Sequence, residues 1–327
     1  MGYYRVNYDT ESLSKLCDAV ASKALSSVDG LNVLDDLFSL IAAGKANTVE
    51  GLRLLKAYKQ EDSYIVWNNI SQQLAKLSVI LADQEYYDDW IRFKLDLLSG
   101  IKQSVSWEPE AGEDHLTTLL RSLILSELGR TGDEEIRLEA KRRFDQHASG
   151  KTPISPDIRA AVLKIVAGMG KEEDYNTMVT MHNGAELHEE KCRIERAGLG
   201  SFSNKVLLSK ALEMSLGEEV RAQDTVHFIS SIAVKRLGRD LAWQFFKDKF
   251  VLLSERCSSG FLLSRLVKSC SADLLGEERA RELEQFFTDH PLAGSEMNVA
   301  QAVETIRLNT ARLERDGAKI ENFFRNN

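Results

Sequence analysis

The spacing of apolar residues along this chain restricts its fold more than any other feature of the sequence. After the first nine residues, apolar side chains recur every three or four positions. In the segment RDLAWQFFKDKFVLLSE these positions are Ala242, Phe246, Phe250 and Leu253. This period places them on one side of an α-helix, so the segment is predicted to form one buried helix face. The chain is therefore expected to be all-α after residue 9.

Local signals predict where individual helices begin and end. Asn47 and Glu50 have the spacing of a capping box, in which each side chain bonds to a backbone amide of the first turn. Gly44 suits the left-handed end of the preceding helix. Pro156 fits a first helical turn, where its missing N–H costs no hydrogen bond. We count about sixteen short helices separated by brief breaks.

The C-terminal third has a weak period. Helix pairs are expected to begin near Ser201, Gly238 and Gly276, about 38 residues apart, which is close to the ~40-residue repeat of HEAT-type helix pairs. The predicted fold is an α-solenoid, a HEAT/ARM-like superhelical array of antiparallel helix pairs with a concave face. The longest polar connections, 104–114 and 147–155, are predicted hinges.

The N-terminus differs from the rest of the chain. GYYRVNYD, residues 2–9, alternates aromatic or apolar residues with polar ones, which predicts a β-strand. Nothing later in the chain reads as its partner, so it is expected to be a single orphan strand.

Composition excludes several classes of function. The 327 residues carry a net charge of −8, and the only basic run, Lys141 to Arg143, is interpreted as a solvated helix face, so no nucleic-acid partner is expected. No run approaches the ~20 apolar residues of a membrane span. The four cysteines have no CxxC pairing, which favours a reducing compartment and a cytoplasmic protein.

One stretch, HNGAELHEEKC, comes close to a metal-site motif. His188 and Glu189 begin like HExxH, whose two histidines at i and i+4 hold one zinc ion, but the fifth position is Cys192. A polar helix face is the preferred interpretation. No GxSxG, P-loop or GxGxxG is present. The chain is therefore expected to have no catalytic, cofactor-binding or metal-binding residues of its own.

Several longer segments, in order, resemble one family. The chain is similar to the helical C-terminal (ERAP1-like, HEAT-like) domain of M1-family zinc aminopeptidases, and most similar to the puromycin-sensitive aminopeptidase group. The segments that carry the resemblance are GYYRVNYD (2–9), DDLFSLIAAG (35–44), HLTTLLRSLIL (115–125), EEKCRIERAGLG (189–200), EEVRAQDTV (218–226), GRDLAWQFFKDKF (238–250), SSGFLLSRLVK (258–268), FFTDHP (286–291) and ETIRLNTARLERD (304–316).

The resemblance implies a domain without catalysis of its own. In that family an upstream domain carries HExxH, its zinc ion and a GAMEN segment, and neither motif is present in this chain. Residues 1–9 are then the last strand of a preceding β-domain, with Met1 an added initiator, and 10–327 form the helical domain. Its partners would be the parent's own catalytic and β-domains and peptide substrates.

The resemblance also implies a role for the domain. It would close over the catalytic domain, form a wall of the substrate chamber and gate peptide access. Arginines on its inner face would bind peptide carboxylates. The candidates are Arg193, Arg196, Arg221 and Arg265, and salt bridges within the domain are the alternative for each. Two other classes stay open, a free-standing helical scaffold that binds proteins and a small metalloenzyme using His188, Glu189 and Cys192.

The chain departs from the family pattern at two places. Gly30 follows Asp29 where the family has Arg, and Arg312 replaces an aromatic residue in the last helix. Arg312 is expected to lie along the surface with its aliphatic stem packed.

Overall fold

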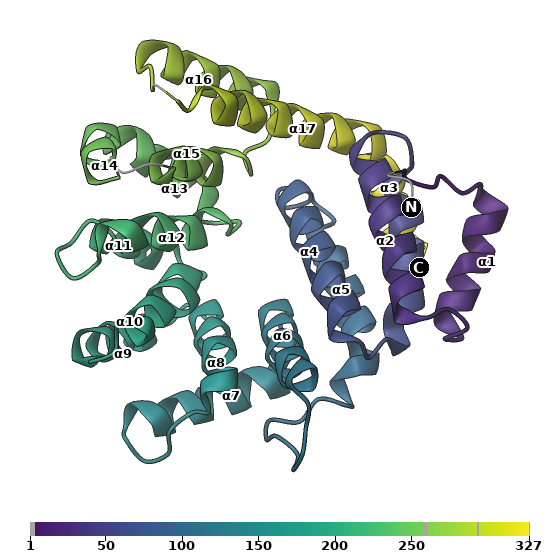
Figure 1. The fold of residues 1–327 in the computed structure, drawn as a ribbon, viewed down its shortest axis with the longest axis horizontal. Helices are drawn as coiled ribbons and strands as arrows, with labels where there is room; N and C mark the ends of the chain where they lie inside the picture. Colours follow the sequence, from purple (N-terminus) through teal and green to yellow (C-terminus); the bar gives the residue numbers. More distant parts are fainter. Residues whose placement is uncertain (1–3, 258–260, 293, 327) are drawn as a thin grey trace. The chain divides into compact units, whose positions relative to one another are not determined.

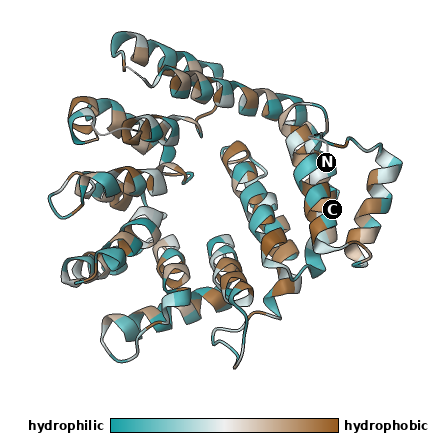
Figure 2. Ribbon diagram, in the orientation of Figure 1, coloured by the Kyte–Doolittle hydropathy of each residue, from teal (hydrophilic) through white to brown (hydrophobic). Residues whose placement is uncertain are grey.

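The computed structural model describes residues 4–257, 261–292 and 294–326. Over these residues it contains seventeen α-helices and no β-strand (Figure 1), so the all-α prediction is confirmed. The chain divides into two compact units, unit 1 (Met1–Asp133 and Ala311–Asn327) and unit 2 (Glu134–Thr310). Hydrophobic and hydrophilic residues alternate around individual helices such as α4 and α5 (Figure 2), as the apolar period predicts.

Unit 1 is built from the first six helices and the end of the last one. The helices are α1 (Thr10–Ala21), α2 (Ser27–Ala42), α3 (Thr48–Ala57), α4 (Tyr64–Ile80), α5 (Tyr87–Lys102), α6 (His115–Thr131) and the C-terminal part of α17 (Glu296–Arg325), with the 3-10 turn η1 (Tyr58–Gln60) after α3. Aromatic rings hold the end of α17 in this unit. Phe324 lies 5.8 Å from Phe93 and 6.4 Å from Trp90, measured between ring centroids.

The N-terminal strand prediction is not confirmed. Residues 1–3 lie outside the described part of the chain, and residues 4–9 form no strand, because a strand needs a hydrogen-bonded partner. Instead, this segment is tied to α2. The Arg5 guanidinium pairs with Asp35 and Asp36, and the Val6 N–H donates to Asp36 Oδ2 at 3.1 Å.

Unit 2 contains the remaining helices. They are α7 (Glu134–Ala148), α8 (Pro156–Gly168), α9 (Glu172–Gly184), α10 (His188–Arg193), α11 (Lys205–Met214), α12 (Ala222–Ala233), α13 (Arg239–Asp248), α14 (Phe250–Arg256), α15 (Leu262–Ser271), α16 (Glu277–Asp289) and the first part of α17. Between α10 and α11 the chain forms a π-helical turn, η2 (Ile194–Gly198), and a 3-10 turn, η3 (Leu199–Ser201). Helices α11, α13 and α16 begin close to the predicted starts of the helix pairs.

The segment predicted as one helix from Arg239 to Glu255 is two helices. Lys249 adopts φ −108° and ψ 16°, which ends α13 and starts α14. The Phe250 ring then meets Phe286 edge-on, with 5.3 Å between ring centroids. Aromatic packing of this kind contributes about 0.5–1.5 kcal/mol beyond area burial, which helps to offset the interrupted helix. Phe246 and Leu253 are buried, so the predicted apolar face is present although the helix is broken.

The predicted helix boundaries near residue 47 are confirmed. Asn47 and Glu50 form the full capping box, with Glu50 accepting from the Asn47 N–H at 2.9 Å. Gly44 has φ +71°, the left-handed conformation that glycine adopts at low cost. Pro156 occupies the first turn of α8. These features depend on local chemistry, which is why the sequence alone predicts them.

The surface prediction for Arg312 is wrong. Its side chain is buried, and burial lowers the pKa of the guanidinium to about 10, opposed by the charge of Asp316. Arg312 Nε donates to the Thr48 hydroxyl at 3.1 Å, and that hydroxyl donates to Asp316 Oδ2 at 2.6 Å. Arg315 also donates to Asp316, at 2.7 Å. These hydrogen bonds with Thr48 and the nearby charge of Asp316 stabilise Arg312 in a buried position.

The connection from α5 to α6, where one hinge was predicted, is attached to α6. Arg121 is buried, donates from Nε to the Ser106 carbonyl at 2.9 Å and pairs with both carboxylate oxygens of Glu113. The hydrogen bonds from Arg121 lower the pKa of Glu113 to about 2. Hinge motion at 104–114 or 147–155 stays a prediction. Among the described helices, none has the length and apolar character of a membrane span.

Candidate functional site

The turn that follows α10 positions most of the predicted site residues of unit 2. Arg193 ends α10, and Arg196 lies on the π-helical turn η2, a geometry that often marks functional sites. The buried Nε2 atom of His182, on α9, lies 2.8 Å from Glu195 Oε1, on η2. This contact holds η2 against α9. Gly200 lets the turn approach α12 closely, because a Cβ there would lie 1.9 Å from the Ser231 hydroxyl.

A basic pocket of about 490 Å³ opens beside this turn. Its lining comes from α8, α10, η2, η3 and the end of α12, all within unit 2. The charged lining residues are Lys164, Arg193, Arg196, Lys235 and Glu189. Four cations face one carboxylate, although the whole chain is acidic, so this pocket is suited to anionic groups.

The two arginines in the pocket differ in their partners. Arg193 pairs with Glu190 and, at 3.1 Å, with Glu189, as the salt-bridge alternative anticipated. Arg196 is exposed, and its Nε donates to the Cys192 carbonyl at 3.1 Å. Among the described residues, no carboxylate lies within ion-pair distance of Arg196. The guanidinium of Arg196 is therefore the one better placed to meet a ligand.

The other two predicted arginines lie outside this pocket. Arg221 is exposed at the N-cap of α12, and Arg265 is exposed on α15. In the part of the chain that the structure describes, neither has a carboxylate within ion-pair distance. The pKa of His227 on α12 is lowered by burial and by the positive charges of Arg265 and Arg196. The charges of Arg196 and Arg265 therefore both reach His227, against the opposing charge of Asp224, whereas Arg221 is not among the groups that shift its pKa.

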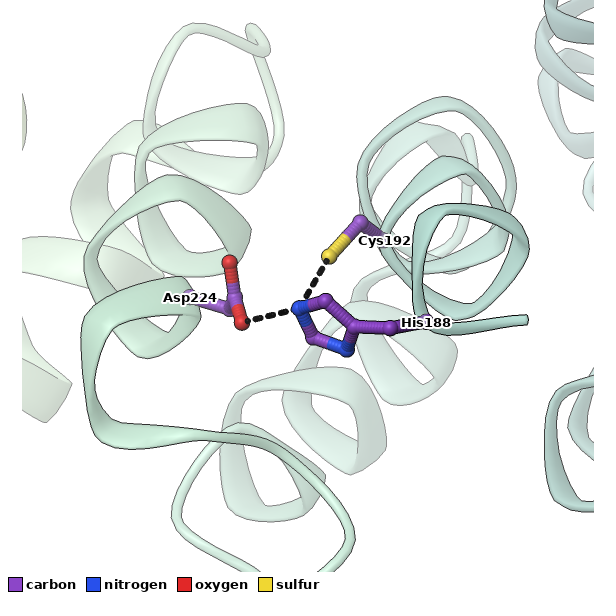
Figure 3. A group of neighbouring side chains, drawn as sticks. All are labelled: His188, Cys192 and Asp224. Carbon is purple, nitrogen blue, oxygen red and sulfur yellow. Dashed lines mark hydrogen bonds and ion pairs between the residues drawn. The ribbon is translucent and has the colours of Figure 1, made fainter. Parts of the chain in front are cut away.

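A second group of functional side chains lies on the other face of α10. His188 and Cys192 are one turn apart on α10, and Asp224 reaches them from the first turn of α12 (Figure 3). His188 Nε2 lies 3.4 Å from Cys192 Sγ and 3.0 Å from Asp224 Oδ2. Burial, followed by the charges of Asp224 and Glu195, raises the pKa of the Cys192 thiol to about 11.

Sequence reasoning identified only part of each group. It singled out His188 and Cys192 but not Asp224, which is 32 residues further along the chain and carries no motif. It also missed Lys164 and Lys235 in the basic pocket. Glu189, its proposed metal-site partner, is exposed and points to Arg193 instead. No local pattern signals contacts between α8, α10 and α12, because they depend on how the helices stack.

Comparison with curated proteins finds aminopeptidases that match this chain over nearly its whole length. Curated relatives include aminopeptidase M1 of Arabidopsis thaliana, 30% identical over 96% of this chain and 36% of the relative. Puromycin-sensitive aminopeptidase of Caenorhabditis elegans is 26% identical over 99% of the chain and 35% of its own length. Human glutamyl aminopeptidase is 27% identical over the whole chain and 34% of its own length.

The chain spans about a third of the length of these relatives. The family described as the ERAP1-like C-terminal domain matches residues 1–308. That match covers most of both units. This chain therefore belongs to the ERAP1-like C-terminal domain family of M1 aminopeptidases.

Proposed function

We propose that this chain is the non-catalytic C-terminal domain of a zinc aminopeptidase that removes N-terminal residues from peptides. In that protein it closes over the catalytic domain, forms a wall of the substrate chamber and binds the carboxylates of long peptides. Zinc and the HExxH motif belong to the catalytic domain of the parent. The family match supports the aminopeptidase parent, and the observation that carries the carboxylate-binding role is the basic pocket around Arg196 in an otherwise acidic chain.

The charges of unit 2 support binding of an extended acidic ligand. The pocket presents Arg196 without a carboxylate within ion-pair distance among the described residues, and Arg265, whose charge also acts on His227, lies in the same region of unit 2. Two exposed arginines whose charges both act on His227 suit a peptide chain that carries more than one carboxylate. A guanidinium binds such groups with paired, charge-assisted hydrogen bonds. Arg221 is kept as a weaker candidate, because nothing links it to this region.

The helical architecture supports the role of a chamber wall. In unit 2, α11 contacts α13 and α12 contacts α15, so equivalent helices of successive pairs lie beside one another. We extend this pattern to an α-solenoid, whose concave face is a common binding surface. In such a parent, residues 4–9 would form a strand if a β-domain supplied the hydrogen-bonded partner. The four free cysteines agree with a cytoplasmic parent.

The experiment compares long and short substrates in the full-length parent. A charge-assisted hydrogen bond contributes roughly 1.5–3 kcal/mol, and about 1.4 kcal/mol corresponds to a tenfold change in affinity. Arg196→Ala should therefore raise KM for long acidic peptides about tenfold or more. It should leave kcat for a short aminoacyl substrate nearly unchanged, because no group at the zinc ion has moved.

Arg281→Ala is the matched control. Arg281 is also an exposed arginine of unit 2, but it pairs with Glu277 on α16 and does not line the pocket. The control variant should have the same KM for long peptides and the same kcat for the short substrate as the wild type. Equal behaviour of Arg196→Ala and the control with long peptides would contradict a carboxylate contact. The alternative role, a free-standing protein-binding scaffold, predicts that no HExxH is encoded upstream of this chain.

A further inference from the structure

Three side chains that commonly bind transition metals converge at the contact between α10 and α12. His188 and Cys192, at i and i+4, project from one face of α10, and Asp224 projects from α12 (Figure 3). Their donor atoms all lie within 4.8 Å of one another. In Figure 3 the ring nitrogen Nε2 of His188 is the one that lies between the sulfur and the carboxylate, while the other nitrogen points away.

The distances between donor atoms resemble those of a tetrahedral zinc site. Zinc binds imidazole nitrogen at about 2.0–2.1 Å, thiolate sulfur at about 2.3 Å and carboxylate oxygen at about 2.0–2.2 Å. Tetrahedral angles then separate nitrogen from sulfur by about 3.6 Å and nitrogen from oxygen by about 3.4 Å. The two observed nitrogen separations are 3.4 Å and 3.0 Å, a few tenths of an ångström from these values, and the sulfur and the carboxylate oxygen lie within 4.8 Å of each other.

The Asp224 carboxylate supplies a second, independent observation. Its Oδ2 atom is almost inaccessible to solvent and accepts no hydrogen bond of acceptable geometry from the described residues. Its neighbour at 3.0 Å is His188 Nε2, which forms an ion pair with it when the imidazole is protonated and is a potential metal ligand when neutral. Buried carboxylate oxygens are normally satisfied, and this one can be satisfied by a protonated His188 or by a cation bound among the three side chains.

We propose that His188, Cys192 and Asp224 bind a zinc ion that links α10 to α12. The thiol releases its proton to solvent on binding, so one thiolate and one carboxylate balance the 2+ charge. Cys192 is buried, whereas the His188 side chain is 34% exposed, which leaves a path of entry and a fourth position for water. This proposal goes beyond the peptide-binding role and departs from the sequence-based expectation of no metal site.

The ligand set differs from the HExxH-like alternative considered from the sequence. Glu189 is not part of the cluster, because its carboxylate pairs with Arg193 on the pocket side of α10. No general base of the HExxH type is therefore placed beside the ion. The site ties two helices together rather than repeating a zinc-hydrolase centre.

Cobalt substitution in the 327-residue chain tests the proposal directly. Co²⁺ should bind one ion per chain and produce the near-ultraviolet charge-transfer band of a cobalt–thiolate bond, and Zn²⁺ should displace it. Cys192→Ser should abolish this band, whereas Cys257→Ser, which alters another buried cysteine of unit 2, should retain it. His188→Ala and Asp224→Asn should weaken zinc binding at least about a hundredfold, since even loss of an outer partner costs ten- to a hundredfold.

Circular dichroism of each variant separates loss of a ligand from loss of the fold. Asp240→Asn, an aspartate in the first turn of α13, is the control for Asp224→Asn and should bind zinc normally. Absence of the charge-transfer band in the wild-type chain would overturn the proposal without any variant. Persistence of the band in Cys192→Ser would overturn it as well.

Discussion

Buried cations in unit 1 and exposed cations in unit 2 have different surroundings. Lys94 and Arg312 in unit 1 are 3% and 6% exposed. The charge of a nearby carboxylate, Glu127 for Lys94 and Asp316 for Arg312, stabilises each cation. Arg196 and Arg265 in unit 2 are exposed, and among the described residues neither has a carboxylate within ion-pair distance. The first pair has its interactions within the fold, whereas the second pair keeps its donors available to a ligand.

This difference separates charges that have partners within the fold from charges that are exposed to solvent. A buried ion is expensive to remove from water, so it persists only where fixed partners surround it. An exposed arginine contributes little to stability, and its loss should affect binding more than folding. Stability measurements in unit 1 and substrate measurements in unit 2 therefore address the two halves of the comparison.

The largest effect is expected at Asp316, the central acceptor of the buried network. Asp316→Ala leaves Arg312 buried without its counter-charge and removes the acceptor of the Thr48 hydroxyl. We expect a loss of about 3–5 kcal/mol in the free energy of unfolding, the range for breaking a buried pair. Chemical denaturation measures it. Asp62→Ala, at an exposed pair with Lys23 in the same unit, should cost less than about 1 kcal/mol, and equal losses would contradict the comparison.

Replacing Lys94 should raise the free energy of unfolding, in contrast to replacing Asp316, and the gain should depend on pH. Burial lowers the pKa of Lys94 to about 8 from an ordinary value of 10.5, aided by the charge of Arg130. The unfolded chain therefore binds more protons than the folded chain between these pH values, and stability gains from rising pH. Below pH 8 the buried charge costs up to about 3 kcal/mol, which Lys94→Met removes.

Denaturation of wild type and Lys94→Met across this pH range gives the test. The advantage of the variant should be largest at neutral pH and should disappear as the pH approaches 10.5. A constant difference across the range would mean that Lys94 acts through packing against Trp90, whose ring centroid lies 5.6 Å from the ammonium nitrogen. That outcome would mean that the buried charge of Lys94 does not lower the stability of unit 1.

The sequence predicted features that a few neighbouring residues determine. The apolar period predicted the helices, and the spacing of Asn47 and Glu50 predicted the start of α3. Both signals depend on local geometry. The break at Lys249 was missed, since no proline or glycine marks it in the sequence and the contact that accompanies it, Phe250 against Phe286 on α16, is not local. Burial of Arg312 was missed because its partner Thr48 lies 264 residues away.

The candidate site divides in the same way. His188 and Cys192 were identified because i and i+4 positions share a helix face, a local rule. Asp224 could not be identified, because its approach depends on the stacking of α12 against α10 and its neighbouring turn η2. Resemblance to a family supplied the arginine candidates, and only the fold separated the paired Arg193 from Arg196.

The N-terminal segment of unit 1 contains Arg5, a partly exposed cation that pairs with Asp35 and Asp36. Asp36→Ala removes the acceptor of the Val6 N–H and one partner of Arg5. A hydrogen bond of this kind contributes about 0.5–1.5 kcal/mol, so exchange of the Val6 amide should accelerate about two- to tenfold. Hydrogen exchange followed by NMR measures it. Unchanged protection would mean that other contacts hold residues 4–9 against unit 1.

The smallest effect tests whether pairing alone separates Arg193 from Arg196. Glu189 is 83% exposed and accepts from Arg193 at 3.1 Å, whereas Glu190 also accepts from Arg159 and is more buried. Exposed pairs at i and i+4 contribute about 0.3–0.5 kcal/mol, so Glu189→Gln should release one Arg193 donor and lower KM for long acidic peptides about twofold. Glu219→Gln, at an exposed pair outside the pocket, is the control. If KM stays unchanged in Glu189→Gln, then Glu190 alone determines the position of Arg193, and carboxylate binding by the pocket depends on Arg196.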